Sequence, residues 1–164
     1  MKKALIDQDC INKFVKAIQF ELGHEYLYRF LSNAMGAAGY FGAAAYFLAE
    51  SKEEGEHYQK HINFLNDLGA LPELPVLNPK VGPVTTMEYA IKMAYTNELG
   101  LLNYYKDMYN TEMMKPEITE HLLFYIKTQR DAVGFYGDIL ATFESELKNQ
   151  NINMVIDQKL KDLA

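Results

Sequence analysis

The chain has 164 residues and a formal net charge of −6 at pH 7, with 49% hydrophobic and 23% charged residues. This length predicts a single domain, residues 1–164, and the composition is that of a globular protein rather than a disordered or membrane-embedded one. The acidic balance argues against a nucleic-acid partner, because phosphate backbones are bound by clustered Lys and Arg.

The first part of the chain is predicted to fold as a helical hairpin. No proline occurs before Pro72, and Gly36, Gly39 and Gly42 interrupt an otherwise helical pattern. We expect one helix on each side of these glycines. The first runs from about Asp9, which caps it, to about Ala38, and the second runs from about Ala43 to Leu68, where Gly69 closes it.

A second hairpin is predicted after a long connector. The connector, Leu71 to Val84, holds four of the five prolines and cannot be helical over its length. Thr85 or Thr86 then caps a helix to about Met114, and Pro116 opens a fourth helix that ends near Lys148. Residues 153–163 can form a short fifth helix. Two hairpins joined by an extended crossover predict an all-α four-helix bundle.

Each of the four long helices carries a polar residue near the centre of its apolar stripe. A helix turns about 100° per residue, so the stripe can be projected from the sequence. With hairpin turns near Tyr40 and Lys115, these polar residues lie 14 to 19 positions from their turns and can share one level. They are Glu21, Glu54, Glu98 and Gln129, with His57 on the same face as Glu54.

Three carboxylates that meet in an apolar interior need a positive partner. An unpaired buried carboxylate is costly to desolvate and otherwise becomes neutral by a pKa shift. Carboxylates with imidazole suit Fe, Mn or Zn in a bundle core. We therefore predict two divalent ions, with Glu54 bridging them and His57 bound to one. The alternative is that these side chains are partly exposed on a loosely predicted stripe.

Four segments resemble the non-haem ferritins, and the resemblance runs from about Ile11 to Leu147. Residues 42–72, GAAAYFLAESKEEGEHYQKHINFLNDLGALP, contain an EExxH core and are similar to the second helix of that family and its exit. The segments FELGHEYLYRF (20–30), NELG (97–100) and KTQRDA (127–132) resemble the matching parts of the other three helices.

The resemblance implies a ferritin-like bundle with a heavy-chain-type ferroxidase site. Glu21 is then a terminal ligand, Glu98 the ligand of the third helix, and Gln129 a residue that orients the bound oxygen species. Tyr28 is the aromatic residue beside the site. The implied activity is oxidation of two Fe(II) ions per subunit by dioxygen or peroxide, with ferric mineral stored in a homo-oligomeric cage of 24 subunits.

Departures from related families narrow this expectation. Bacterioferritins have a haem-ligating methionine where this chain has Gly55, and a second ExxH where it has Gln129 and Ala132, so we expect no haem. Many bacterial ferritins bind a third iron with extra acids. Of those acids this chain keeps only Glu53 and Asp131, so the resemblance does not extend to a complete third site.

Further polar residues lie near the apolar arcs of the first hairpin. They are His24 and Glu25 in the first helix, and Glu50 and His61 in the second. We expect them to occupy surface or hydrogen-bonded positions. The alternative is that residues of this set serve as auxiliary iron ligands, and the same alternative applies to Glu53 and Asp131.

Two other functions fit the same residues. One is a di-iron oxidase or peroxidase that acts on a small substrate without storing iron, and the other is a non-catalytic bundle filled by Zn(II) or Mn(II). No apolar run approaches the ~20 residues of a membrane span, and the start of the chain turns polar too soon for a signal peptide. We therefore expect a cytoplasmic protein without membrane contact.

Overall fold

The computed structural model describes residues 3–145 and 151–164, which form five helices. Their order confirms the predicted all-α bundle with a long crossover and a short fifth helix. The predicted end of the fourth helix near Lys148 lies outside the described residues. The helices are α1 (Gln8–Ala37), α2 (Phe41–Asp67), α3 (Met87–Glu112), α4 (Pro116–Ser145) and α5 (Ile152–Lys161).

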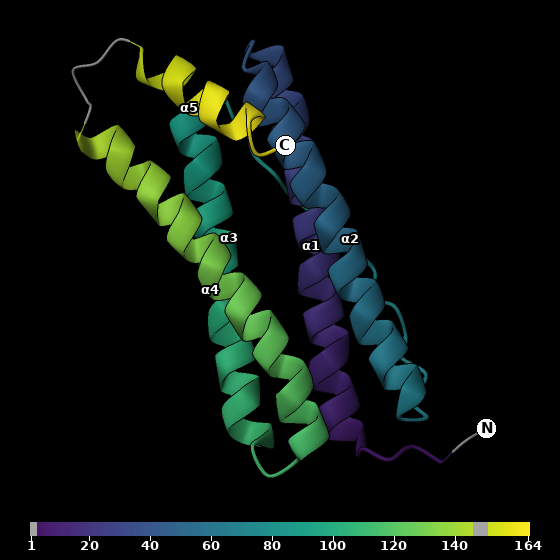
Figure 1. Ribbon diagram of the computed structural model, residues 1–164. Helices are drawn as coiled ribbons and strands as arrows, with labels where there is room; N and C mark the ends of the chain where they lie inside the picture. Colours follow the sequence, from purple (N-terminus) through teal and green to yellow (C-terminus); the bar gives the residue numbers. More distant parts are fainter. Residues whose placement is uncertain (1–2, 146–150) are drawn as a thin grey trace.

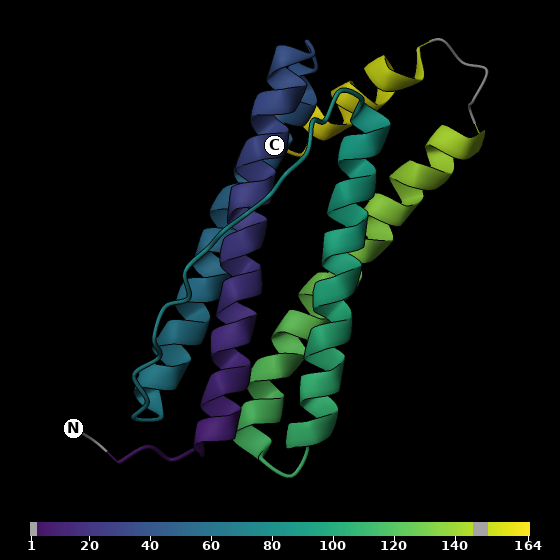
Figure 2. The ribbon, with the colours of Figure 1, turned by 180° about the vertical axis from the view of Figure 1, so that it is seen from behind.

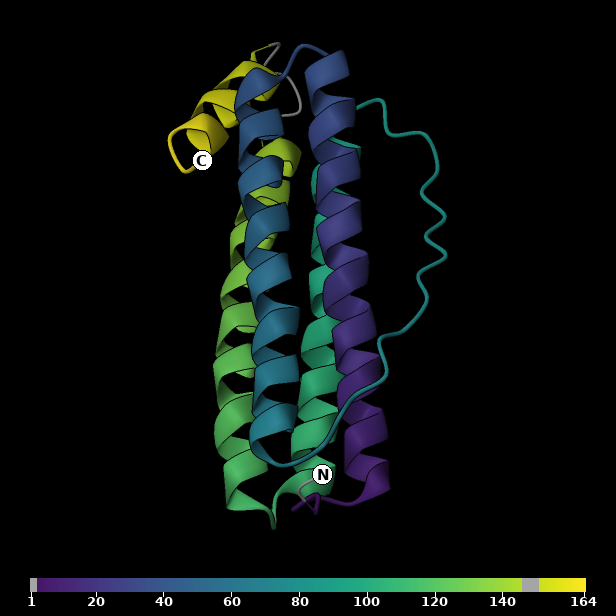
Figure 3. The same cartoon turned by 90° about the vertical axis from the view of Figure 1, so that its right-hand side faces the viewer.

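The four long helices form two antiparallel hairpins, α1 with α2 and α3 with α4 (Figure 1). Residues 68–86 connect the hairpins and run back along the length of the bundle beside α1, as Figure 2 shows. Seen from the side, the long helices stand next to one another with the crossover outside them (Figure 3). Among the described residues, none of the helices combines the length and the apolar character needed to cross a bilayer.

The start of α1 differs from the prediction that Asp9 is its cap. The Asp7 side chain accepts the backbone N–H of Cys10 at 2.8 Å, so Asp7 is the N-cap and the helix begins at Gln8. Both aspartates stand close enough to the helix start to serve as caps. Asp7 takes the role because its carboxylate also binds Lys115 at the α3–α4 turn, whereas Asp9 lies in the first turn and pairs with Lys13.

Two of the expected glycine breaks occur where the chain needs a positive φ angle. Gly39 follows α1 with φ 87° and Gly69 follows α2 with φ 78°, a conformation that costs glycine little. Gly36 lies inside α1 and Gly42 inside α2, so neither interrupts a helix as expected. Gly42 is needed for a different reason, which is that α5 packs against it. A Cβ atom at Gly42 would stand 2.1 Å from the backbone oxygen of Asp157, so only glycine fits there.

The interior of the bundle consists of two apolar clusters with a polar level between them. The cluster toward the α1–α2 turn includes Tyr28, Leu31, Met35, Phe47, Ile91 and Tyr136. The cluster toward the α3–α4 turn includes Phe14, Ile18, Leu65, Tyr105, Leu122 and Tyr125. Because both clusters exclude water, the polar side chains between them lie in an environment that penalises any unpaired charge.

Candidate metal centre

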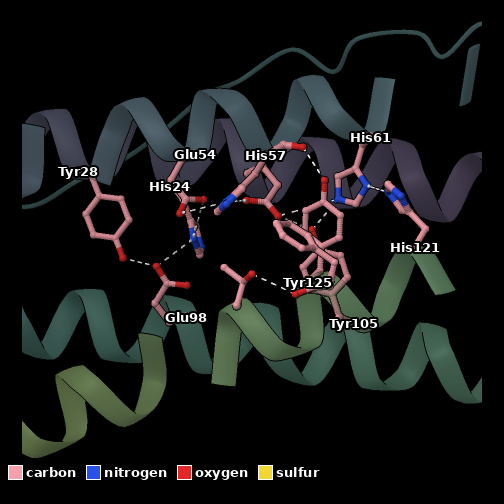
Figure 4. A network of polar contacts seen from close by, with 12 residues as sticks. His24, Tyr28, Glu54, His57, His61, Glu98, Tyr105, His121 and Tyr125 are labelled. Carbon is pink, nitrogen blue, oxygen red and sulfur yellow. Dashed lines mark hydrogen bonds and ion pairs between the residues drawn. The ribbon is translucent and has the colours of Figure 1, made fainter. Parts of the chain in front are cut away.

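Six polar side chains meet between the two apolar clusters. The structure brings Glu21, Glu54, Glu98 and Gln129 to one level, as the sequence predicts, and none of the four is more than 4% exposed. His24 and His57 lie beside them, and Figure 4 shows most of this group in close view. Each long helix contributes at least one side chain: α1 gives Glu21 and His24, α2 Glu54 and His57, α3 Glu98, and α4 Gln129.

The first group of potential ligands is Glu21, Glu54 and His57. His57 Nδ1 lies 3.6 Å from Glu21 Oε2 and 3.6 Å from Glu54 Oε1. Glu54 and His57 are three residues apart on α2, a spacing that places both side chains on one face of the helix. One oxygen of Glu54 therefore faces the α1 carboxylate and the imidazole together.

The second group is His24, Glu54 and Glu98. His24 Nδ1 lies 3.9 Å from Glu54 Oε2 and 3.7 Å from Glu98 Oε1. The two groups share Glu54, which offers a different oxygen to each. Donor atoms that bind one divalent first-row ion at about 2.1 Å stand about 3–4 Å apart, so both groups fit such an ion.

Unpartnered polar atoms are concentrated at this level. Seven buried side-chain nitrogen or oxygen atoms of the described residues have no hydrogen-bond partner, and six of them belong to the six residues of the centre. Buried polar atoms are nearly always satisfied, so six exceptions in one place call for a ligand. The six atoms are Glu21 Oε2, His24 Nδ1, Glu54 Oε2, His57 Nδ1, Glu98 Oε2 and Gln129 Oε1.

The three carboxyl groups cannot all be ionised when only protein surrounds them. Burial and the charge of Glu21 raise the pKa of Glu54 well above its usual range, and burial raises the pKa of Glu98 to about 8. Burial opposes ionisation of Glu21 as well, but hydrogen bonding to His57 and Glu54 outweighs it and lowers the pKa of Glu21. The raised pKa values of Glu54 and Glu98 favour their neutral acid forms, so a cation must displace protons to bind.

The buried histidines are neutral. Burial lowers the pKa of His24 to about 4 and the pKa of His61 to about 3. A neutral imidazole has a free nitrogen lone pair, which is the form that binds metals.

Tyrosine hydroxyls hold the carboxylates at the two ends of the centre. Tyr28 donates a short hydrogen bond to Glu98, and Tyr105 donates a short hydrogen bond to Glu21. Tyr28 thus lies beside the site, as the resemblance implies. Residues that orient ligands in this way govern how well a metal site is formed before the metal arrives.

Tyr105 also begins a chain of hydrogen bonds that leads away from the centre. Its hydroxyl lies 2.7 Å from His61 Nε2, and His61 Nδ1 lies 3.0 Å from His121 Nε2 (Figure 4). Since the hydroxyl proton of Tyr105 goes to Glu21, His61 donates to Tyr105 and accepts from His121. His61 therefore occupies the hydrogen-bonded position expected for it.

A cavity of about 210 Å³ opens beside the centre between α2 and α4. Besides Glu54, His57, Glu98 and Gln129, its lining includes the acidic residues Glu50, Glu53 and Asp131. Burial raises the pKa of Glu50 to about 7. The acidic lining gives this opening a negative potential that favours cations over anions.

The other residues considered as auxiliary ligands lie away from both donor groups. Glu25 pairs with Arg29 at 3.0 Å, and Asp131 pairs with Lys127 at 2.5 Å. Glu53 is exposed at the cavity. Glu25 is thus in a surface ion pair, in agreement with the preferred expectation, and Asp131 forms another ion pair of this kind.

For His24 the preferred expectation is wrong. It was expected at the surface or in a hydrogen bond, but it is 4% exposed and its Nδ1 has no hydrogen-bond partner. The signal that could have found it is its spacing from Glu21, which repeats the spacing between Glu54 and His57.

Comparison with known proteins agrees with this architecture. A family model described as a ferritin-like domain matches residues 11–145. Bacterial non-haem ferritins of Escherichia coli O157:H7 and Shigella flexneri are each 20% identical over 161 residues, which cover 97% of this chain and 98% of theirs.

Solved structures share the fold. An open-pore ferritin from the hyperthermophilic archaeon Archaeoglobus fulgidus matches with a TM-score of 0.89 at 17% identity, covering 96% of this chain and 98% of that one. A closed form of the Archaeoglobus fulgidus ferritin, engineered by site-directed mutagenesis, matches with a TM-score of 0.87 at 16% identity, covering 95% and 96%.

Proposed function

Since this chain belongs to the ferritin family, we propose that it binds Fe(II) in pairs at the buried centre, oxidises it and stores the ferric product. The ligands are Glu21, Glu54 and His57 for one ion, and Glu54 and Glu98 for the other. Iron is the substrate and the cargo of this reaction.

The observation that carries the proposal is the pair of donor groups that share Glu54. One carboxylate with an oxygen in each group can bridge two ions, which a single-metal site does not require. Two divalent cations also bring four positive charges against the three carboxylates that remain once Glu54 and Glu98 have lost their protons, so they more than offset the buried negative charge.

The donor set suits iron in both oxidation states. Carboxylate oxygen with imidazole nitrogen binds Fe(II), and the excess of oxygen donors favours the harder Fe(III) ion. Oxidation is therefore favourable at this site. Each Fe(II) loses one electron, and one dioxygen accepts two electrons and two protons to leave as hydrogen peroxide.

Gln129 and Tyr28 have supporting roles in this proposal. The amide oxygen of Gln129 is buried without a partner, and Gln129 lines the cavity, so the amide can hydrogen-bond water or the oxidant beside the ions. Tyr28 holds Glu98 through its hydroxyl. The acidic cavity between α2 and α4 is the proposed route for iron, because its negative potential attracts the cation.

Storage requires an assembly, because one bundle of this size encloses no room for mineral. We propose a cytoplasmic cage of 24 copies. Exposed apolar side chains support a subunit contact along the crossover, where Leu71, Leu74 and Val76 are 76%, 60% and 88% exposed. Surfaces of this kind are usually covered by a partner.

The chemistry is tested by measuring oxygen consumption after Fe(II) is added to the protein in air-saturated buffer. Glu54→Ala should lower the initial rate by more than about 100-fold, because it removes the donor common to both ions. Glu56→Gln, which changes an exposed acid two positions along α2, should leave the initial rate unchanged. Equal rates for Glu54→Ala and the unaltered protein would refute the assignment.

Size-exclusion chromatography with light scattering tests storage. A cage elutes as a large shell and retains iron after desalting. Rapid oxidation by a small species that retains no iron would instead identify a non-storing oxidase, and metal binding without oxygen consumption would identify a non-catalytic bundle.

A further inference from the structure

Helices α1 and α2 present the same pair of residues to the centre. Glu21 and His24 on α1 repeat the three-residue spacing of Glu54 and His57 on α2. The two histidines approach different parts of the centre: His57 faces Glu21, and His24 faces Glu98, with Glu54 between them. Figure 4 shows His24 on the Tyr28 and Glu98 side, away from His61 and His121.

Among the described residues, His24 Nδ1 has no hydrogen-bond partner, either as a donor or as an acceptor. The nearest carboxylate oxygens stand 3.7 and 3.9 Å away, beyond hydrogen-bonding distance, and the residue is 4% exposed. The Tyr28 ring stands edge-on to the His24 ring, with 6.3 Å between the two ring centroids. A cavity of about 220 Å³, lined by α1, α3 and residues 79–81 of the crossover, also reaches His24.

A buried histidine with a purely structural role looks different in this same molecule. His61 is completely buried, yet both its ring nitrogens have partners, Tyr105 at 2.7 Å and His121 at 3.0 Å. His24 shares the burial of His61 but not its hydrogen bonds. Its free Nδ1 is instead placed like that of His57, facing two carboxylate oxygens at distances that fit a shared ion.

We propose that His24 binds the second ion directly through Nδ1, together with Glu54 and Glu98. Each of the two ions then has one imidazole, supplied by α1 to one and by α2 to the other. This inference rests on the proposed two-ion function, but it adds a ligand outside the set that the sequence resemblance implies. The nitrogen donor raises the affinity of the second ion for divalent metals such as Fe(II) and Co(II).

Anaerobic calorimetric titration with Co(II) tests this ligand without relying on activity. The unaltered protein should bind two ions per subunit. His24→Ala should weaken one of them by more than about 100-fold, beyond the 10–100-fold that is typical of residues that only orient a ligand. His24→Gln, which fills more of the same space, should show the same loss with an intact fold by circular dichroism.

Two matched variants separate a local effect from a general one. His57→Ala should weaken the other ion and leave the His24 ion in place. His121→Gln changes a histidine that hydrogen-bonds to His61 and is not one of the proposed ligands. This variant should retain two ions of unchanged affinity. If folded His24→Ala or His24→Gln retains both ions at full affinity, the proposed role of His24 is wrong, while the two-ion function stands. Fewer than two ions in the unaltered protein would overturn the two-ion function itself.

Discussion

Among the described residues, glutamate side chains are buried in two places, and their charge is treated in opposite ways. Glu112, at the end of α3, is 3% exposed, and both of its oxygens are matched by lysines, Lys13 at 2.7 Å and Lys115 at 2.6 Å. Glu21, Glu54 and Glu98 are equally buried, but no lysine or arginine pairs with them among the described residues, and each keeps one unpartnered oxygen.

The pKa values follow this difference. Burial acts to raise the pKa of Glu112, but hydrogen bonds from Lys115 and Lys13 outweigh it, so the pKa falls below its usual range. At the centre, burial raises the pKa of Glu98 to about 8. The fold therefore supplies its own cations where a buried carboxylate is structural, and leaves oxygens free where an external cation is expected to bind.

The largest contrast should come from Glu54→Gln, which removes the donor shared by both ions. In the unaltered protein, Co(II) at 100 times its Kd should stabilise the fold by about 2.7 kcal/mol. The variant should show almost none of this gain, while its metal-free form should melt no lower than the unaltered protein, because Gln resembles the protonated acid. Differential scanning calorimetry with and without Co(II) measures both effects.

A smaller effect is expected from the hydroxyls that hold the carboxylates. Tyr105→Phe removes the donor to Glu21 and should weaken metal binding about 10–100-fold, as is usual for residues that orient ligands. Tyr104→Phe is a matched control, since Tyr104 donates to the backbone oxygen of Lys13 instead. Calorimetric titration compares them, and equal affinities for the two variants would contradict the role of Tyr105.

Glu112→Gln should reverse the pattern of Glu54→Gln. The substitution leaves Lys13 and Lys115 without their shared carboxylate, so it should destabilise the fold. The expected loss is only about 1–2 kcal/mol, because both lysines reach solvent. Metal binding should not change. Urea unfolding of the metal-free proteins gives the free energy, and a loss of metal affinity would show that the two regions are coupled.

The effect of Glu112 should also depend on pH in a defined direction. Its pKa is lowered by folding, so its contribution is present above the unfolded value of 4.5 and is lost as pH falls through the folded value. The stability difference between the unaltered protein and Glu112→Gln should therefore shrink below about pH 4. A difference that grows in acid would contradict the ion pairs.

The smallest expected effect is a change with pH in the number of protons released on metal binding. At pH 7 Glu54 and Glu98 carry protons that the ions must displace, whereas at pH 9 Glu98 is already ionised. Release should fall by about one proton per subunit between these pH values. Calorimetry in buffers of different ionisation enthalpy counts the protons, and Glu98→Gln should abolish the change.

The sequence predicts much of this architecture because the relevant signals are local. The proline-rich connector separates the hairpins, and Thr86 caps α3 through the backbone N–H of Tyr89, as expected for one of the two candidate threonines. Positions counted from the turns were enough to bring Glu21, Glu54 and Glu98 to one level, because a helix rises by a constant amount per residue.

The errors concern features that depend on contacts between distant segments. Asp7 rather than Asp9 caps α1 because Lys115, more than a hundred residues away, binds Asp7. Gly42 lies inside α2, and it is glycine because Asp157 of α5 packs directly on it, not because a helix breaks there. The spacing of His24 from Glu21 places both side chains on one face of α1, but the approach of Glu98 from α3, with Oε1 3.7 Å from His24 Nδ1, joins segments that are distant in the sequence.

The most direct test of the central claim is an anomalous difference map from crystals soaked anaerobically in Fe(II). Two peaks are expected in each subunit, one among Glu21, Glu54 and His57 and the other among His24, Glu54 and Glu98, with Glu54 contacting both. A map without iron at this level, or with iron only at the acidic cavity lined by Glu50, Glu53 and Asp131, would contradict it.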